Sequence, residues 1–428
     1  MLRNNQRLSI SNSALIGFGI ASFYLVIARN GDLSGKVTLS LVLYGGCLAI
    51  ALLGSRLKCK YIEPKKLLWL ISLVPFLYSS PLWLDAALFA LGIGFIVLLE
   101  YRTSDLRGLY KAIIFVAIVN ALCVFIQFID KGFFDEFARA WYPEGMYQQY
   151  LRTMRYENYL NGCNAVSGNT AGYLAYCIGL LFSIHFIRRY KKINTMNIVI
   201  FIVSFLALLL VGKRSILLCA VAAIVIIYIL SGRASKKIQK FFFLVLITLV
   251  LMRILPLTAE LFPEINTITR IADSINGLLY GQDITSGRST LLGYALLQFE
   301  SAPILGIGWK GFNRLTTSLY NYSAAHYVNN DYVQVLCETG IVGFICIYLP
   351  MIICLIKTIR LYTAVAKSEL NDIGKTSFVF SLFIQLFYIM YSFFEIPLYD
   401  RCFFFMYIIA VSIGYCVQKE FRVLQHQT

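Results

Sequence analysis

The sequence predicts an all-α integral membrane protein with about twelve transmembrane helices. Of its 428 residues, 59% are hydrophobic and only 14% are charged, against about 45–50% and about 25% in soluble domains. Apolar runs recur along nearly the whole chain, and about 20 such residues cross a hydrocarbon core of roughly 30 Å. Because these runs occupy more than half of the chain, we expect residues 1–428 to form a single polytopic membrane domain.

The expected spans follow one another along the chain as continuous apolar runs bounded by charged or turn-forming residues. They lie at 13–28, 37–54, 67–80, 83–100, 112–129, 169–187, 196–211, 215–231, 241–258, 332–356, 376–394 and 402–418. Most connections between them are short or basic. Two connections are long, at 130–168 and 259–331.

The distribution of charge predicts the orientation. The net charge is +16, and most Lys and Arg residues fall on one side of the predicted membrane, as in the connections at 55–66 and 188–195. Short basic loops stay in the cytoplasm, so we expect both termini inside and both long connections outside. This distribution also excludes a nucleic-acid partner as the reason for the charge. Eleven cysteines without a Cys-x-x-Cys pair indicate neither a disulfide framework nor a zinc site.

The two long outer connections are where we expect chemistry outside the membrane. Both are rich in aromatic residues, including Tyr159 in the first and Trp309 in the second. Flat aromatic faces suit the apolar faces of sugar rings, whereas interfacial belts are the commonest use of Trp and Tyr beside a bilayer. Both uses stay open for Trp309, which is a candidate substrate contact.

A tight turn, Gly212-Lys213-Arg214-Ser215, separates two apolar runs at the predicted outer face. A cation at the bilayer edge is costly unless its side chain snorkels to water or pairs with an anion. Arg214 is therefore either a snorkelling residue or a ligand for a phosphate group, whose oxygens a guanidinium binds in pairs. Lys213 is a second candidate contact.

A second cation, Arg288, opens an amphipathic helix predicted from 288 to 300 and ended by Pro303. The N–H groups of a first helical turn attract anions. Arg288 is therefore either part of an anion site or a solvated loop charge. The apolar face of this helix carries Leu291, Leu292, Ala295, Leu296 and Phe299.

Polar residues also enter the tenth predicted span from outside. Asp331, Gln334 and Glu338 share one helical face in an otherwise apolar segment. Intramembrane carboxylates are functional candidates by default, although Glu338 could instead cross-link neighbouring helices. His326, one of three histidines, is a candidate base, and Asn329 and Asn330 are candidate substrate contacts.

Further cations, Arg152 and Arg155, precede Asn164, Asn169 and Thr170 at the mouth of the sixth predicted span. Their guanidinium groups are candidate substrate contacts on the outer face. We expect no metal and no cofactor, because the outer connections carry no acidic metal cluster and no nucleotide-binding loop.

Together these motifs resemble the O-antigen polymerase and ligase superfamily of bacterial envelope glycosyltransferases. The likeness is strongest over 286–343 and extends across almost the whole chain through the order of the motifs. It rests on Val211-Gly212-Lys213-Arg214-Ser215, Gly287-Arg288, Ser301-Ala302-Pro303-Ile304-Leu305-Gly306-Ile307-Gly308, the run from Asn329-Asn330-Asp331 to Glu338-Thr339-Gly340, and the arginines before Asn169.

The resemblance implies a membrane glycosyltransferase fold of the GT-C-like type in the bacterial inner membrane. Members act on undecaprenyl-pyrophosphate-linked glycans at the periplasmic face, in some cases with a chain-length regulator protein. An acceptor hydroxyl attacks the anomeric carbon, and the lipid pyrophosphate leaves. By this resemblance, Arg214 and Arg288 would neutralise the leaving group.

One departure from the family pattern bears on the reaction. The family commonly has a His-Asn pair where this chain has Asn329-Asn330, and in ligases that histidine is a proposed base. Asn329 cannot take up the proton, so His326, about one helical turn away, Asp331 or Glu338 would replace it, or no strong base is needed. The loss favours a polymerase of O-antigen over a ligase, with a polytopic transporter or flippase as a third alternative.

Overall fold

The computed structural model describes most of the chain. The described residues are 2–29, 46, 56–57, 63–79, 83–100, 103–142, 144–155, 159–187, 194–231, 239, 254, 256–280, 288–319 and 326–426. Two predicted spans, 37–54 and 241–258, lie outside the described residues except for 46, 254 and 256–258.

The described part of the chain is helical, apart from a two-residue antiparallel pair of β1 (Arg56–Leu57) and β2 (Leu99–Glu100). The longer helices are α1 (Leu2–Arg29), α5 (Trp83–Leu98), α6 (Leu106–Ile129), α9 (Ser167–Ile187), α10 (Thr195–Val211), α11 (Arg214–Leu230), α16 (Asp331–Lys367), α17 (Asp372–Tyr391) and α18 (Arg401–Gln425). The shorter ones are α3 (Pro64–Leu67), η1 (Leu68–Leu73), α4 (Pro75–Tyr78), η2 (Thr103–Asp105), α7 (Lys131–Trp141), α8 (Glu144–Arg155), α13 (Asn266–Tyr280), α14 (Arg288–Ser301) and α15 (Gly311–Ser318).

Five helices in the described residues are long and apolar enough to cross a membrane: α6, α9, α16, α17 and α18. Residues 12–25 of α1, residues 85–98 of α5, and helices α10 and α11 are shorter apolar segments. Their positions agree with the predicted spans, but twelve crossings remain a prediction. The span predicted at 67–80 is broken into η1 and α4, where Pro75 cannot donate a backbone hydrogen bond and starts a new helix.

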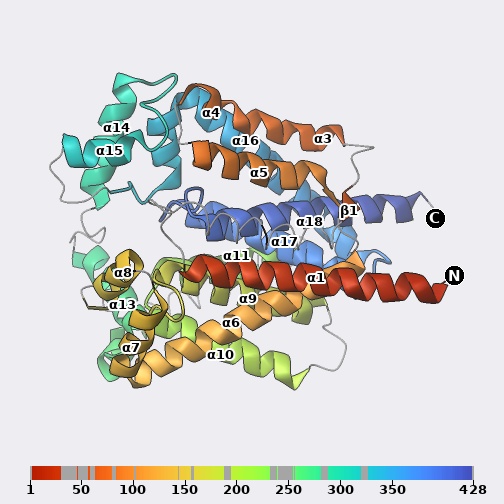
Figure 1. Ribbon diagram of the computed structural model, residues 1–428, viewed down its shortest axis with the longest axis horizontal. Helices are drawn as coiled ribbons and strands as arrows, with labels where there is room; N and C mark the ends of the chain where they lie inside the picture. Colours follow the sequence, from red (N-terminus) through yellow and green to blue (C-terminus); the bar gives the residue numbers. More distant parts are fainter. Residues whose placement is uncertain are drawn as a thin grey trace.

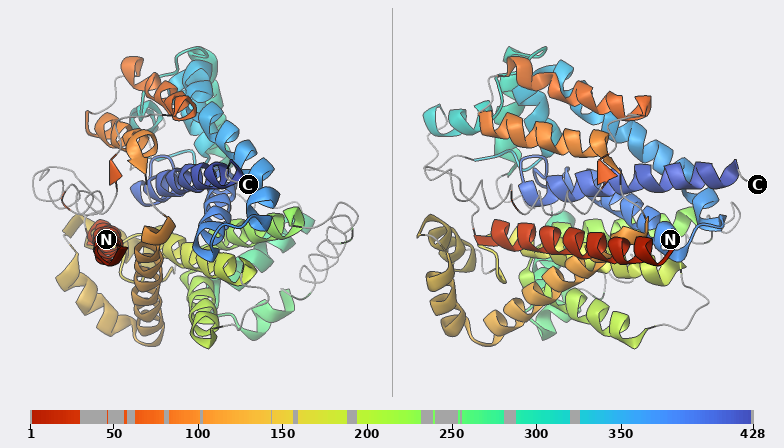
Figure 2. Two further views of the ribbon diagram at one scale, coloured as in Figure 1. Left: turned by 90° about the vertical axis from the view of Figure 1, so that its right-hand side faces the viewer. Right: turned by 45° about the vertical axis from the view of Figure 1, so that its right-hand side comes forward.

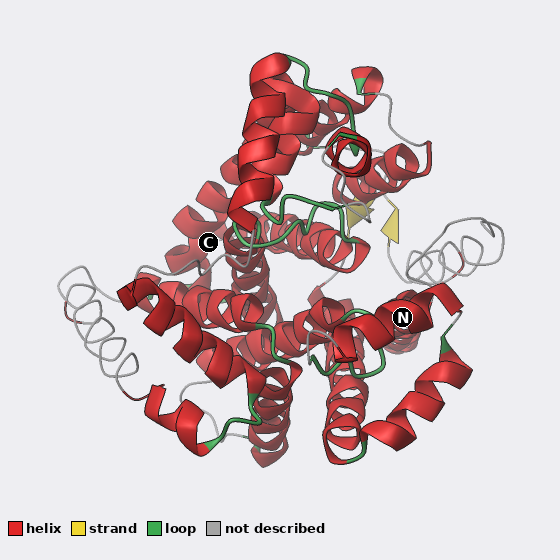
Figure 3. Cartoon of the chain, turned by 90° about the vertical axis from the view of Figure 1, so that its left-hand side faces the viewer, coloured by secondary structure: helices red, strands yellow, loops and turns green. Residues whose placement is uncertain are grey.

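The two termini lie at one end of the molecule, and the short helices of the two long connections lie at the other end (Figure 1). Figure 2 shows α18 near the middle of the bundle, where α17 packs against α18, α9 and α11. Figure 3 looks onto the end opposite the termini, where short helices and loops lie over the ends of the long helices. We name this end the outer end, after the predicted orientation.

A kink in α16 builds much of the outer end. Gly340 has φ 63°, in the left-handed region, and interrupts the helix. A Cβ atom at this position would lie 2.2 Å from the carbonyl oxygen of Ile304. The loop after α14 packs against this interruption of α16. Gly308 N–H donates to the Glu338 carbonyl oxygen at 2.9 Å, and Ile341 N–H donates to a loop carbonyl. The glycines and Pro303 of the loop therefore belong to a segment whose backbone packs closely against α16.

Candidate functional site

Arg214 is the first residue of α11 and follows a tight turn. Helix α10 ends at Val211, and Gly212 takes φ 90°, which lets the next helix begin two residues later. The guanidinium Nη1 of Arg214 donates to the carbonyl oxygen of Arg270 at 2.9 Å and to the hydroxyl of Ser274. Arg214 is therefore held against α13, a helix of the second long connection.

Tyr159, in the first long connection, contacts two cations. The Lys213 ammonium lies 4.1 Å from the centre of its ring, and the Arg270 guanidinium lies 4.2 Å from it. Arg270 also donates to the Tyr159 hydroxyl. Cation–π contacts contribute roughly 0.5–2 kcal/mol each, depending on desolvation. Tyr159 thus joins the turn before α11 to α13.

Arg288, the first residue of α14, lies near this group of cations. Burial first, and then the charges of Arg270 and Arg288, lower the pKa of Arg214 from its usual value, whereas Tyr159 and Asp273 raise it. Arg288 itself pairs with Glu395 at 3.1 Å, and its side chain remains 43% exposed. The two arginines that the sequence singled out therefore lie within electrostatic range of each other. We name Lys213, Arg214, Arg270 and Arg288 the cationic cluster.

The cationic cluster is suited to a ligand with more than one negative charge. Three guanidinium groups and one ammonium come from three segments that only the folded chain assembles. Guanidinium groups present paired donors that match phosphate oxygens, and they remain charged at neutral pH. A diphosphate has the charge and the number of acceptor oxygens to engage such a group.

The start of α16 is fixed by backbone and cap contacts. The Asn330 side chain caps the helix by accepting from Val333 N–H at 3.1 Å. Asp331 N–H donates to the carbonyl oxygens of Ser392 and Glu395, at 2.8 and 3.1 Å. The Asp331 side chain is fully buried, and the Ser392 hydroxyl donates to it at 3.4 Å. Asn330 therefore has a capping role, and Asp331 lies enclosed between α16 and the turn after α17.

Asn329 and His326 precede this helix in non-helical chain. Asn329 has φ 54°, a left-handed conformation that asparagine adopts more readily than most residues. His326 is half-buried, and its backbone N–H donates to the Thr316 hydroxyl at 3.0 Å. Because α16 begins at Asp331, the helical turn expected between His326 and Asn329 is not formed.

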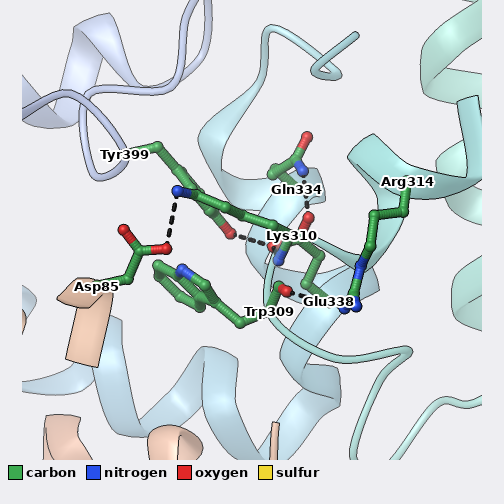
Figure 4. A network of polar contacts seen from close by, with 7 residues as sticks. All are labelled: Asp85, Trp309, Lys310, Arg314, Gln334, Glu338 and Tyr399. Atoms are coloured by element: carbon green, nitrogen blue, oxygen red, sulfur yellow. Dashed lines mark hydrogen bonds and ion pairs between the residues drawn. The ribbon is translucent and has the colours of Figure 1, made fainter. Parts of the chain in front are cut away.

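Glu338 lies at the centre of a polar network (Figure 4). Its Oε2 accepts from the Tyr399 hydroxyl and from Lys310 N–H, both at 2.7 Å, and its Oε1 accepts from the Gln334 amide at 2.5 Å. Burial first, and the Glu338 charge second, raise the pKa of the Tyr399 hydroxyl well above its usual value. Tyr399 therefore stays protonated and donates. These contacts favour the alternative in which Glu338 cross-links neighbouring segments.

Trp309 packs inside the protein beside this network. It is 5% exposed, and its ring centre lies 4.6 Å from that of Tyr399 with the planes nearly parallel. Phe76 lies at the same distance. The next residue, Lys310, pairs with Asp85 of α5 at 2.8 Å. The geometry favours a packing role for Trp309 over contact with a sugar.

In the first long connection, Arg152 is exposed on α8, and the Arg155 side chain lies outside the described part of the structure. Asn164 donates to Asn120 and to Thr170, both at 2.6 Å, in a buried network with α6. Asn164 and Thr170 therefore join helices at this end rather than lining an open surface.

Some functional candidates could not be found from the sequence. Arg270 lies in an amphipathic stretch, 266–280, whose pattern could have predicted the helix but not its contact with Arg214. Glu395 and Tyr399 lie in a short turn between two helices, and nothing local marks their partners. Within the described ranges, no group of three or more His, Cys, Asp or Glu side chains is placed to hold a metal ion.

Comparison with known proteins agrees with the motifs. Residues 199–348 match the family model described as O-antigen ligase, a segment that contains the whole cationic cluster, Asp331 and Glu338. No curated protein matches the chain. The match over 199–348 confirms the resemblance to the O-antigen polymerase and ligase superfamily.

Proposed function

We propose that this protein is a polymerase of lipid-linked O-antigen, a surface polysaccharide, in the inner membrane of a bacterium. A hydroxyl of an incoming lipid-linked repeat unit attacks the anomeric carbon of the growing glycan. The bond from that carbon to undecaprenyl diphosphate breaks, and the lipid diphosphate leaves. The cationic cluster at the outer end is the observation that carries this proposal.

The cluster suits the charge change of this reaction. As the glycosidic bond to the lipid breaks, negative charge grows on the diphosphate oxygens. Fixed donors aimed at developing charge usually supply the largest part of enzymatic rate enhancement. Arg214 and Arg270 are already held by α13 and Tyr159, so little reorganisation is needed when the charge develops.

The acceptor hydroxyl loses a proton during the attack, and we assign His326 as the base that accepts it. Both carboxylate oxygens of Glu338 already accept hydrogen bonds, and Asp331 is fully buried. His326 is half-buried in the loop that leads into α16, so it has the better access to an acceptor from outside. A positioned general base contributes about 10²–10⁴-fold to a rate.

The identity of the acceptor separates this proposal from its nearest rival, an O-antigen ligase that passes the glycan to lipid A core. Asn329 stands where family ligases have a histidine, and its left-handed backbone gives asparagine a conformational role there. The absence of that histidine, a proposed base in the ligases, favours the polymerase. A transporter is less well supported, since the cationic cluster lies at one end of the bundle.

Deletion of the gene followed by electrophoresis of lipopolysaccharide tests the proposal. A polymerase mutant carries single repeat units on the core. Bare core with retained lipid-linked polymer would instead identify a ligase, and loss of lipid-linked repeats from the outer face would identify a flippase. Restoration of long chains by the wild-type gene, but not by the Arg214→Ala gene, would connect the result to the cationic cluster.

A further inference from the structure

Helix α6 carries the chain to the outer boundary of the membrane core. Lys111 lies near its inner end, and residues 112–129 after it carry no charge. At about 1.5 Å per residue this uncharged stretch rises about 27 Å, close to the roughly 30 Å of a hydrocarbon core. The end of α6 at Ile129 therefore lies where the acyl chains meet the lipid headgroups.

Helix α7 begins at this boundary as a separate element. Asp130 has extended backbone, and its carboxylate caps α7 by accepting from Phe133 N–H at 3.0 Å. Helix α7 has 11 residues, about half of the number that crosses a bilayer. Figure 1 places it at the outer end, next to the end of α6. It is therefore too short to be a further span.

One face of α7 is both apolar and exposed. Phe133, Phe137 and Trp141 recur every four residues and share this face, and Phe133 is 59% exposed. The rings of Phe137 and Trp141 stack nearly parallel, with their centres 6.0 Å apart. Exposed apolar residues also line the outer part of α6, at Leu122, Ile126 and Ile129. The apolar surface thus continues along the chain from a helix long enough to span the membrane into α7.

The other sides of α7 have different surroundings. Phe134 and Ala138 are buried in a small core with Tyr150 of α8. Glu136 and Arg139 are exposed polar residues. A helix with a charged side and an aromatic side is typical of the membrane–water interface, where Trp is enriched.

We propose that α7 lies in the outer interface of the bilayer, with Phe133, Phe137 and Trp141 inserted among the acyl chains beside the headgroups. The continuity with the lipid-facing residues of α6 favours lipid over a protein partner. The charges of Glu136 and Arg139 then remain in water.

This location also bears on the cationic cluster. Helix α7 packs on α8, and the Thr153 carbonyl oxygen of α8 accepts from Tyr159 N–H at 3.1 Å. Tyr159 in turn contacts two cations of the cluster. An interfacial α7 therefore helps to hold the cluster near the level of the lipid headgroups, where the diphosphate of a lipid-linked glycan lies. This consequence rests on the proposed function, whereas the location of α7 does not.

Spin labels on the full-length protein test the location. A ketone-bearing amino acid that takes a nitroxide replaces Phe133, Phe137, Glu136 or Arg139, one at a time, so that native cysteines stay unlabelled. The protein is held in nanodiscs of phosphatidylethanolamine and phosphatidylglycerol. Power saturation then compares collisions with oxygen, which dissolves among acyl chains, and with a water-soluble nickel chelate. We expect labels at Phe133 and Phe137 to favour oxygen, and the matched controls at Glu136 and Arg139 to favour nickel.

Two results would overturn the proposal. Preference for nickel at Phe133 and Phe137 would place this face in water. Protection of both positions from both reagents would mean that protein, such as a second copy of the chain, covers it. Two positions on each face preserve the comparison if one variant fails to fold. The readout needs no glycan synthesis, so the proposed function can fail while the location of α7 stands, and the reverse.

Discussion

Arg214 donates from its guanidinium to the backbone carbonyl oxygen of Arg270 at 2.9 Å. This bond joins two cationic residues from separate segments, the α10–α11 turn and α13, at the outer end. Like charges gathered in this way are unfavourable unless an anion or a polar partner offsets them. Ser274, Tyr159 and Glu395 offset part of this repulsion, and we expect a bound anion to offset the rest.

Loss of either singled-out arginine should stop polymer synthesis. Removal of one fixed donor from a site of developing charge costs about 10²–10³-fold in rate, so we expect Arg214→Ala and Arg288→Ala to leave only single repeats on lipopolysaccharide gels. Lysine at either position should recover little, because an ammonium lacks the paired donors of guanidinium.

Arg139, exposed on α7 at the same end, offers a matched control. Arg139→Ala should keep the wild-type ladder at equal membrane abundance. Wild-type chain lengths in Arg214→Ala and Arg288→Ala would contradict the assignment of the cluster.

The ring of Tyr159 should matter more than its hydroxyl. Tyr159→Leu removes the aromatic face from Lys213 and Arg270, and a loss of roughly 1–2 kcal/mol of cation–π contact corresponds to about a ten-fold lower turnover. Tyr159→Phe keeps the aromatic face, so its turnover should fall less. Initial rates with a purified lipid-linked repeat measure both variants, and equal rates for Leu and Phe would argue against the cation–π contacts.

Glu338→Gln should destabilise the protein. The new amide would place N–H donors against groups that now donate to the carboxylate, and a buried unsatisfied polar group costs about 1–3 kcal/mol. We expect a lower unfolding midpoint in detergent, with a smaller decrease for Tyr399→Phe. Glu300→Gln, at an exposed position of α14, is the control. If Glu338→Gln lost activity at an unchanged midpoint, Glu338 would be a catalytic base and not a cross-link.

A comparison of the turnover of His326→Ala with that of Asp331→Asn tests the assignment of His326 as the base. We expect His326→Ala to lower turnover by about 10²–10⁴-fold with its unfolding midpoint unchanged. Asp331→Asn should keep most of its turnover. Near-normal turnover in His326→Ala would remove this histidine from the reaction, leaving departure of the diphosphate assisted by the arginines as the main source of rate.

Single cysteines test the orientation. A cysteine at Ser318 in α15 should react with an impermeant maleimide in intact spheroplasts, whereas one at Glu369, between α16 and α17, should react only after lysis. Both positions are exposed, and they lie on opposite sides of the predicted membrane. The reverse pattern would overturn the orientation drawn from the distribution of basic residues.

Much of the fold could be predicted from apolar runs alone. The helix beginning at Arg288 and the buried stripe of Asp331, Gln334 and Glu338 also follow from spacing, and the structure confirms both. Helical periodicity carries this information because side chains three and four residues apart share a face. The predicted apolar face of α14 agrees only in part, since Leu291 is buried while Leu296 is exposed.

The partners of these residues could not be predicted from the sequence. Nothing near Glu338 indicates that Tyr399 will donate to it, and nothing near Arg288 indicates Glu395. Such contacts depend on how distant helices pack, which a local pattern does not encode. The kink at Gly340 was likewise not predicted, because a glycine in an apolar run also occurs in unbroken membrane helices.

Binding of a prenyl diphosphate to the purified full-length protein tests the central assignment most directly. Titration of wild-type protein, Arg214→Ala, Arg270→Ala and Arg139→Ala, all in nanodiscs of neutral lipid, gives dissociation constants that do not depend on turnover. We expect Arg214→Ala and Arg270→Ala to bind at least ten-fold more weakly, with Arg139→Ala equal to wild type. Equal affinity in all four proteins would contradict a diphosphate site at the cationic cluster.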